Sequence, residues 1–321
     1  MKHSFIALLV GLFAPSLFAQ VDPNTVYGDD DRRDLYQVTS PAAKKLAEST
    51  VGLFSAGNVT VDPAKGVAAL ATSSYSEEYN LCPEEPFFSQ RTGAFCSGSL
   101  VAPDIIMTAG HCVRDQGNCT GTKFVFGFGI YEEGGKTPES VPASDVYGCA
   151  QLLGREQVND GADWALVRLD RAVSSRKPLA LNRSGVIAKG TGVFVIGHPA
   201  GLPTKIAGGA SVRNADLSGY FTANTDTFGG NSGSAVFNAQ SGLVEGILVR
   251  GEQDYIYKGN CRISNPCPND GCRGEDVTKI SAVMSKIPAP RSEDLARLVK
   301  PGAALASLLD LAALEGSPTP R

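Results

Sequence analysis

The sequence predicts an all-β fold followed by a short C-terminal helical segment. Between about Val51 and Val283, short β-branched or alternating runs are broken by Gly, Pro, Asn and Asp, which is the pattern of a β-sandwich or barrel. Helical periodicity is missing from this region and returns only near the end of the chain. The clearest expected strands are Thr122 to Phe128, Trp164 to Leu169, Val193 to Gly197, Ala235 to Phe237 and Leu243 to Val249.

The first residues, 1–19, have the pattern of a secretory signal peptide. Lys2 gives a positive start, an apolar stretch runs from Phe5 to Phe13, and the small residue Ala19 suits a cleavage site. A transmembrane anchor would need roughly 20 apolar residues, and Pro15 interrupts this run. We therefore expect cleavage after Ala19 and secretion to the extracellular space or the periplasm.

The remaining chain divides into three parts. Residues 20–50 are charged and mixed, and we expect an N-terminal arm or a short pro-segment. Residues 51–288 are long enough for one large β-domain or for two smaller units that share a cleft. In residues 289–321, apolar residues at helical spacing predict helices at Glu293 to Val299 and Ala303 to Leu314, followed by a frayed tail.

Charge and hydropathy argue against two classes of partner. The formal net charge is −4 and no basic cluster is present, so we expect no nucleic-acid partner. No stretch after the signal peptide is apolar enough to span a bilayer, so we expect no membrane association after processing.

The eight cysteines form an even set in an exported chain, which favours disulfides. The cluster Cys261, Cys267 and Cys272 could in principle bind zinc. However, structural zinc sites usually have closer cysteine pairs and a fourth ligand, and no histidine lies nearby. We therefore expect disulfides and no metal.

Three stretches supply the residue types of nucleophilic catalysis: Met107 to Cys112, Asp163 to Leu169, and Gly229 to Ser234. A serine hydroxyl is a weak nucleophile that needs a neutral imidazole as its base, and the imidazole needs a carboxylate to fix its tautomer. The candidates are Ser232 as the nucleophile, His111 as the base and Asp163 as the orienting acid.

Each candidate has an alternative. Ser232 could belong to an ordinary glycine-rich turn. Asp160 competes with Asp163, which we prefer because an apolar strand that can bury the carboxylate follows it. The other histidine of the mature chain, His198, is expected to hold its own loop.

The glycines around Ser232 allow backbone N–H groups to converge, and we assign the oxyanion hole to Gly230 and Ser232.

These motifs resemble those of the chymotrypsin-like serine peptidases. The stretches Thr108 to Cys112 and Gly230 to Ser234 are similar to the motifs around the family's histidine and serine, and the order His, Asp, Ser agrees. Gly197 to Pro203 and Val26 to Arg32 are similar to a loop and to the mature N-terminus of the bacterial glutamyl endopeptidase branch. The resemblance covers residues from about 26 to 285.

The resemblance implies a chymotrypsin-like double six-stranded β-barrel and a secreted serine endopeptidase that acts on proteins or peptides. It also implies a monomer without a cofactor and a disulfide between Cys96 and Cys112. The six other cysteines admit fifteen pairings. Cys119–Cys149 and pairs within Cys82, Cys261, Cys267 and Cys272 are guesses among them. A catalytically silent binding module or an esterase on the same fold remains an alternative.

Substrate preference is ambiguous in the sequence. By the resemblance, Asp226, six residues before Ser232, would lie at the base of the primary pocket and would favour Arg or Lys. The glutamyl branch uses a hydroxyl and a histidine instead. Thr227 supplies the hydroxyl, but Leu248 occupies the histidine's place, so glutamate preference is the alternative. Gly251 completes the expected substrate-binding set.

Activation should also differ from that of trypsin. In trypsin-like enzymes an aspartate immediately before the serine pairs with a newly cut N-terminal amine. Asn231 occupies this place and cannot form the ion pair. The resemblance of Val26 to Arg32 leads to the hypothesis that cleavage after Thr25 produces the mature N-terminus.

Overall fold

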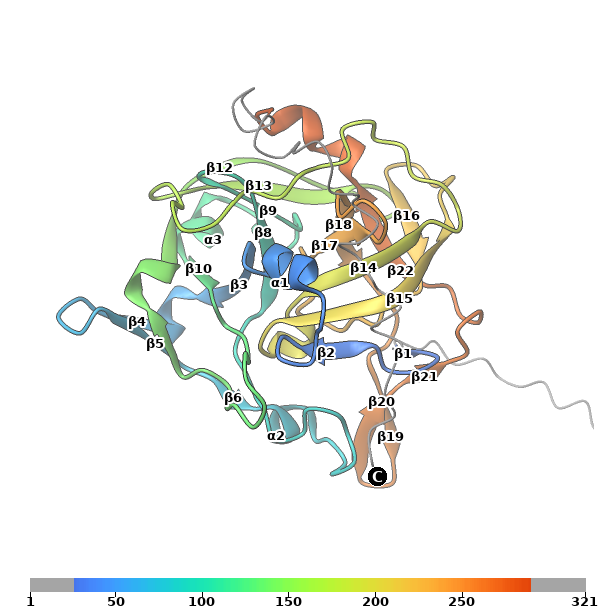
Figure 1. The fold of residues 1–321 in the computed structure, drawn as a ribbon, viewed down its shortest axis with the longest axis horizontal. Helices are drawn as coiled ribbons and strands as arrows, with labels where there is room; N and C mark the ends of the chain where they lie inside the picture. Colours follow the sequence, from blue (N-terminus) through green and yellow to red (C-terminus); the bar gives the residue numbers. More distant parts are fainter. Residues whose placement is uncertain (1–25, 290–321) are drawn as a thin grey trace, which may run out of the picture.

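The computed structural model describes residues 26–289. The expected signal peptide and the expected helices Glu293 to Val299 and Ala303 to Leu314 lie outside the described residues. Within the described range, no helix is long and apolar enough to cross a membrane. The chain folds into two β-barrels that lie side by side, the first drawn mainly in blue to green and the second mainly in yellow to red (Figure 1).

The first barrel is closed and has the strand order β10–β12–β13–β9–β8–β3, with every pairing antiparallel. Its strands are β3 (Thr50–Ser55), β8 (Cys96–Ala102), β9 (Ile105–Thr108), β10 (Thr122–Phe126), β12 (Val146–Gln157) and β13 (Asp163–Leu169). The second barrel has the order β14–β17–β18–β22–β16–β15, and an additional pairing of β14 with β15 closes it. Its strands are β14 (Gly192–Gly197), β15 (Lys205–Asn214), β16 (Tyr220–Ala223), β17 (Ala235–Asn238), β18 (Val244–Arg250) and β22 (Glu275–Lys279).

This architecture confirms the predicted chymotrypsin-like double six-stranded barrel. Two strands of the first barrel are buried along their whole length: all seven residues of β8 and all four of β9 are buried. One core cluster contains Ile106 and Leu166 of the first barrel together with Phe194 and Ile247 of the second. The two barrels therefore share an apolar interface, and burial of this surface holds them together.

The N-terminal arm adds one short strand to the sheet of the second barrel and forms a separate two-stranded sheet with a loop that precedes β22. β2 (Arg32–Asp34) pairs with β15, and β1 (Val26–Tyr27) pairs in parallel with β21 (Pro266–Cys267). Helix α1 (Pro41–Ala47) follows, with the side chain of Ser40 capping its first turn. Residues 26–47 are thus an ordered arm on the barrels.

The remaining elements are small and decorate the loops. They are β4 (Val59–Asp62), β5 (Val67–Leu70), β6 (Ser73–Ser74), β7 (Arg91–Thr92), β11 (Ser140–Pro142), β19 (Tyr255–Lys258), β20 (Cys261–Ser264), α2 (Tyr75–Tyr79), α3 (Gln116–Thr120), and the 3₁₀ turns η1 (Ala56–Asn58), η2 (Ala143–Asp145), η3 (Pro199–Gly201), η4 (Ile280–Ala282) and η5 (Met284–Lys286).

Four disulfides fasten the loops: Cys82–Cys261, Cys96–Cys112, Cys119–Cys149 and Cys267–Cys272. The pair Cys96–Cys112 is the one that the resemblance implied, and Cys119–Cys149 is a guessed pair. The other two disulfides fall within the set Cys82, Cys261, Cys267 and Cys272, as guessed. Cys82–Cys261 joins residues 179 positions apart, and it ties the loop after α2 to the β19–β20 hairpin. A covalent link over such a distance restricts the unfolded chain most strongly.

Candidate active site

The pairing of β13 with β9 brings His111 and Asp163 together. Asp163 is the first residue of β13, and His111 follows the end of β9 by three positions. The two side chains meet with His111 Nδ1 and Asp163 Oδ2 2.7 Å apart. Asp163 is buried at 2% exposure, whereas Asp160 is exposed. Of these two candidates, the structure therefore places Asp163 against the histidine.

Asp163 is held firmly in this position. Its Oδ1 accepts the backbone N–H groups of Gly110, at 2.6 Å, and His111, at 3.1 Å. Its own backbone N–H donates to the hydroxyl of Thr278 in β22 at 2.9 Å, which links the first barrel to the second. Gly110 has to be a glycine, because a Cβ there would lie 2.2 Å from the carbonyl oxygen of Glu156. The carboxylate thus orients a partly exposed imidazole.

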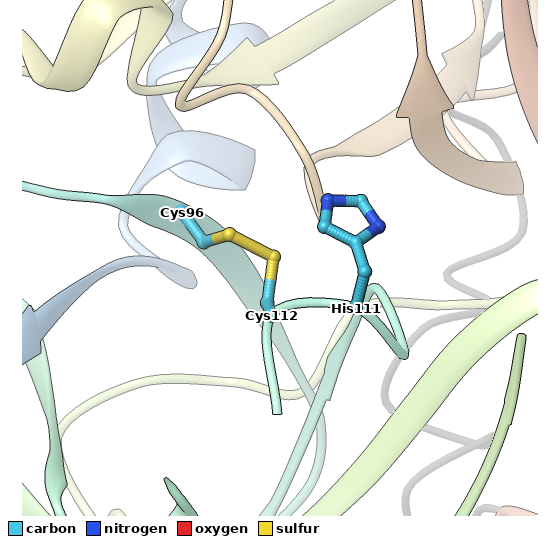
Figure 2. Close-up of side chains that lie close together, drawn as sticks. All are labelled: Cys96, His111 and Cys112. Atoms are coloured by element: carbon cyan, nitrogen blue, oxygen red, sulfur yellow. A yellow bond between two sulfur atoms is a disulfide. The ribbon is translucent and has the colours of Figure 1, made fainter. Parts of the chain in front are cut away.

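The histidine lies beside the disulfide Cys96–Cys112, as Figure 2 shows. The two sulfur atoms and a nitrogen of His111 lie within 4.8 Å of one another, a spacing that could suit a metal ion. The sulfur atoms are bonded to each other, however, so neither can act as the thiolate that a metal requires. The disulfide instead fixes the turn that carries His111 to strand β8.

Ser232 lies in the glycine-rich turn that enters β17, close to the end of β9. Its carbonyl oxygen accepts the N–H of Ser97 at 2.8 Å, and the N–H of Gly233 donates to Leu248 at 2.7 Å. A Cβ on Gly233 would lie 2.2 Å from Thr108 Oγ1, which shows how closely this turn approaches the segment leading to His111. Within residues 26–289, no hydrogen bond joins the Ser232 hydroxyl to His111; such bonds are often long in enzymes without substrate.

Two backbone amides of the turn are available to a ligand. The carbonyl of Gly229 accepts the N–H of Ala200 at 2.6 Å. In a trans peptide the N–H points opposite to the C=O, so the N–H of Gly230 points away from Ala200. The Gly230 carbonyl accepts the hydroxyl of Ser97 at 2.8 Å. In the described part of the chain, the amides of Gly230 and Ser232 donate to no protein acceptor, and such donors can stabilise a developing negative charge.

Ser97 is a positioning residue that the sequence did not reveal. Its hydroxyl donates to Gly230 and also accepts the N–H of His198 at 2.9 Å, so it joins the serine turn to the loop Gly197 to Pro203. No local motif marks Ser97. Its role follows only from the approach of β8 to the turn.

His198 is fully enclosed in its own loop. Its Nδ1 lies 3.0 Å from the carbonyl oxygen of Leu202, its ring stacks on Phe128, and its Nε2 has no partner among the described residues. Burial lowers the pKa of His198 to about 4. These contacts agree with the expected structural role.

A pH dependence of stability follows from this burial. Between the ordinary pKa of 6.5 and the folded value of about 4, the unfolded chain binds a proton at His198 that the folded chain does not. This group therefore destabilises the fold as the pH falls through that range and has no effect above it. Between pH 6.5 and 4, the free energy of unfolding of the wild type should fall by about 3 kcal/mol more than that of the variant His198→Phe. The phenylalanine ring keeps the stacking on Phe128. Urea unfolding at several pH values measures this difference; parallel pH curves would contradict it.

The N-terminal arm occupies Asp226, so its expected place facing a substrate needs correction. The Asp226 carboxyl, 2% exposed, accepts the backbone N–H groups of Tyr27 and Asp31, both at 2.8 Å. Burial raises its pKa to about 8. Next to it, the guanidinium of Arg32 lies 4.0 Å from the centre of the Phe228 ring. The carboxyl turns toward the arm because two backbone amides there satisfy its oxygens, and the arm thereby supports the loop that leads to Ser232.

The other expected pocket residues lie nearby but play different parts. Leu248 belongs to the apolar core of the second barrel, so its side chain serves packing. Thr227 is buried and donates to Glu275 Oε2 at 3.1 Å. Gly251 is exposed, and it follows Val249 and Arg250, which line a depression at the junction of the barrels. The remaining residues of that depression are His111, Gln157, Val158, Asn159 and Asp163.

The two six-stranded barrels define a chymotrypsin-like fold, which holds the histidine–aspartate pair beside a glycine-rich serine turn. Residues 96–247 match the family model described as "Trypsin-like peptidase domain", a segment that contains His111, Asp163 and Ser232. Over this segment the chain is similar to trypsin-like peptidase domains.

Three solved structures have a backbone course similar to that of this chain. The Rv3671c protease from M. tuberculosis in its active form is 15% identical, with 89% of this chain and 96% of that chain covered and a TM-score of 0.44. A Glu endopeptidase in complex with MPD is 17% identical (85% and 100% covered, TM-score 0.48). Human heparin binding protein is 14% identical (86% and 100% covered, TM-score 0.47). These likenesses carry no functional argument at such scores, and no curated protein matches the chain.

Proposed function

We propose that this protein is a secreted serine endopeptidase with His111, Asp163 and Ser232 as its catalytic triad. The observation that carries the proposal is the 2.7 Å contact between His111 Nδ1 and the buried Asp163 carboxyl, beside a serine turn with two available amides. Four disulfides support an oxidising compartment outside the cytoplasm.

The proposed reaction is acyl transfer. Ser232 Oγ attacks the carbonyl carbon of the scissile peptide bond while its proton passes to His111 Nε2. Asp163 keeps the Nδ1 proton in place and stabilises the imidazolium. The amides of Gly230 and Ser232 donate to the oxyanion, and His111 then protonates the leaving amine. Water attacks the resulting ester, His111 takes up the water's proton, and Ser232 leaves with its proton restored.

Hydrolysis of an unfolded protein tests this proposal. We expect the purified, secreted chain to release peptides from reduced and carboxymethylated casein. We also expect pretreatment with a fluorophosphonate, which phosphonylates activated serines, to stop the release, whereas 1,10-phenanthroline leaves it unchanged. A folded chain that neither cleaves casein nor reacts with the fluorophosphonate would contradict the proposal and would favour the silent binding module. Turnover of simple esters without casein cleavage would favour the esterase.

A further inference from the structure

Two adjacent glycines, Gly229 and Gly230, open the candidate serine turn and make its backbone permissive. Gly229 is exposed, and Gly230 has a φ of +92°. Because neither residue has a Cβ, the peptide group between them can rotate at little steric cost. In one orientation the Gly230 N–H faces the position expected for the oxyanion. In the opposite orientation the Gly229 carbonyl would face it and repel the developing negative charge. Contacts from outside the two glycines must therefore select the first orientation.

The peptide groups on both sides of Gly229 are held by other loops. Its carbonyl oxygen accepts the backbone N–H of Ala200 at 2.6 Å, and its own N–H donates to Asp254 Oδ2 at 2.8 Å. Fixing both groups fixes φ and ψ of Gly229 and, with them, the direction of the Gly230 N–H. Ala200 contributes a backbone group to this arrangement, whereas Asp254 contributes a side chain. The Asp254 carboxyl is thus the group whose chemistry can change the hold on Gly229.

The loop between β18 and β19 places Asp254 for this contact. Asp254 is partly buried, and its carbonyl oxygen accepts the N–H of Asn265 at 3.0 Å. The next residue, Tyr255, packs against Phe228, with the ring centres 5.3 Å apart, and Phe228 immediately precedes Gly229. The carboxyl therefore reaches the turn from a loop that packs on the same segment. A hydrogen bond from an N–H to a carboxylate is about twice as strong as one between neutral groups.

The surroundings of Asp254 make its charge sensitive to pH. Burial raises the pKa of Asp254 to about 6, although the Gly229 N–H and the guanidinium of Arg32 favour the charged form. Three more titratable groups interact with this charge, and the pKa of each is raised: Tyr79 of α2, Tyr255 of β19 and Glu275 of β22. The Asp254 carboxyl is charged at higher pH and protonated in acid, where its hold on Gly229 weakens.

We propose that Asp254 is a positioning residue for the oxyanion hole and acts by holding the N–H of Gly229. The inference rests on the proposed peptidase function and adds a side chain outside the triad on which turnover depends. Because Asp254 acts through the direction of the Gly230 N–H, its loss should reduce stabilisation of the transition state more than binding of the substrate. A side chain that only supported the loop would not produce this split between kcat and KM.

The first test uses the fluorogenic peptide that the wild type cleaves fastest. Asp254→Ala should lower kcat by about 10- to 100-fold, the value of one hydrogen bond to a charged group, and change KM by less than about 3-fold. It should weaken inhibition by a peptide aldehyde to a similar extent, because the hemiacetal formed with the serine places its oxygen in the hole. Glu252→Ala is the matched control. Glu252 lies in the same loop, but its carboxylate pairs with Arg273 at 3.4 Å, so kcat should stay within about 3-fold.

The second test uses Asp254→Asn, which removes the charge and keeps an oxygen that can accept the Gly229 N–H. At pH 8 the kcat of the wild type should exceed that of this variant by about 3- to 10-fold. At pH 5 the protonated carboxyl and the amide accept with similar strength, so the two rates should agree within about 2-fold. The ratio of the two rates at each pH removes the contribution of groups that both proteins share.

The outcomes separate this inference from the proposed function. The inference alone is overturned if the wild type cleaves peptides and Asp254→Ala keeps its kcat, if the loss falls on KM, or if Glu252→Ala loses as much. If circular dichroism shows that Asp254→Ala does not fold, Asp254→Asn decides. A ratio of rates that falls toward one at pH 5 supports the inference, and a ratio that is the same at both pH values overturns it. A folded wild type that cleaves neither peptides nor casein removes the peptidase function, and the inference with it.

Discussion

Replacing Ser232 by alanine should abolish peptide hydrolysis, with a loss of kcat of about 10⁶-fold. The reason is that the proposed reaction forms its acyl-enzyme on the Ser232 hydroxyl, with His111 as the base and the amides of Gly230 and Ser232 as oxyanion donors. Binding of substrate should change little, because the lost atom contacts only the reacting carbonyl. Steady-state hydrolysis of the best fluorogenic peptide measures the loss.

Ser234 offers a matched control two residues away. Its side chain is fully buried, and its hydroxyl donates to Asn231 Oδ1 at 3.2 Å, so it does not face the cleft. Ser234→Ala should retain catalysis within about 10-fold, allowing for the loss of one hydrogen bond in the turn. The assignment would be wrong if Ser232→Ala retained the wild-type rate or if only Ser234→Ala lost it.

Asp163→Asn should lower kcat by about 10⁴-fold. The amide group cannot accept a hydrogen bond from the Nδ1 proton with the same strength, and its NH₂ group favours the tautomer of His111 in which Nε2 carries the proton and cannot act as a base. The N–H groups of Gly110 and His111 already point at Oδ1, so they favour placing the amide oxygen there and the NH₂ group toward the imidazole. Measuring kcat and KM separately should show the effect mainly in kcat.

The control for this variant is Asp160→Asn. Asp160 is exposed in the turn before β13, and its loss should leave kcat/KM within about 2-fold. Equal losses in the two variants would point to a general effect of the β12–β13 turn on the site and would contradict an orienting role that belongs to Asp163 alone.

The strands of the fold could be predicted because their local pattern is strong. Trp164 to Leu169 was expected as a strand and forms most of β13, and Val193 to Gly197 forms most of β14. Closure of the barrels could not be derived from local pattern. It depends on pairings between distant strands, such as β10 with β3, whose register is set by packing of the whole core. The barrel prediction therefore came from the family resemblance.

Some residues of the candidate site could likewise be predicted from local sequence, whereas others depend on contacts between distant segments. His111 and Ser232 lie in short motifs that the sequence shows directly, and Asp163 could be selected because a buried strand follows it. The orientation of the Asp226 side chain could not be predicted from the sequence, because its hydrogen-bond partner Tyr27 is 199 positions away. The contact between Tyr27 and Glu275 spans 248 positions. Such contacts exist only after the N-terminal arm has packed on the second barrel.

Locating the serine that reacts with a fluorophosphonate tests the central claim most directly. Intact mass should show one adduct on each active chain. Fragmentation of the tryptic peptide 214–250, which contains Ser232 and Ser234 among its serines, should place the adduct on Ser232 alone. An active chain whose adduct lies on Ser234 or outside this peptide, or one that cleaves peptides without forming any adduct, would contradict Ser232 as the nucleophile.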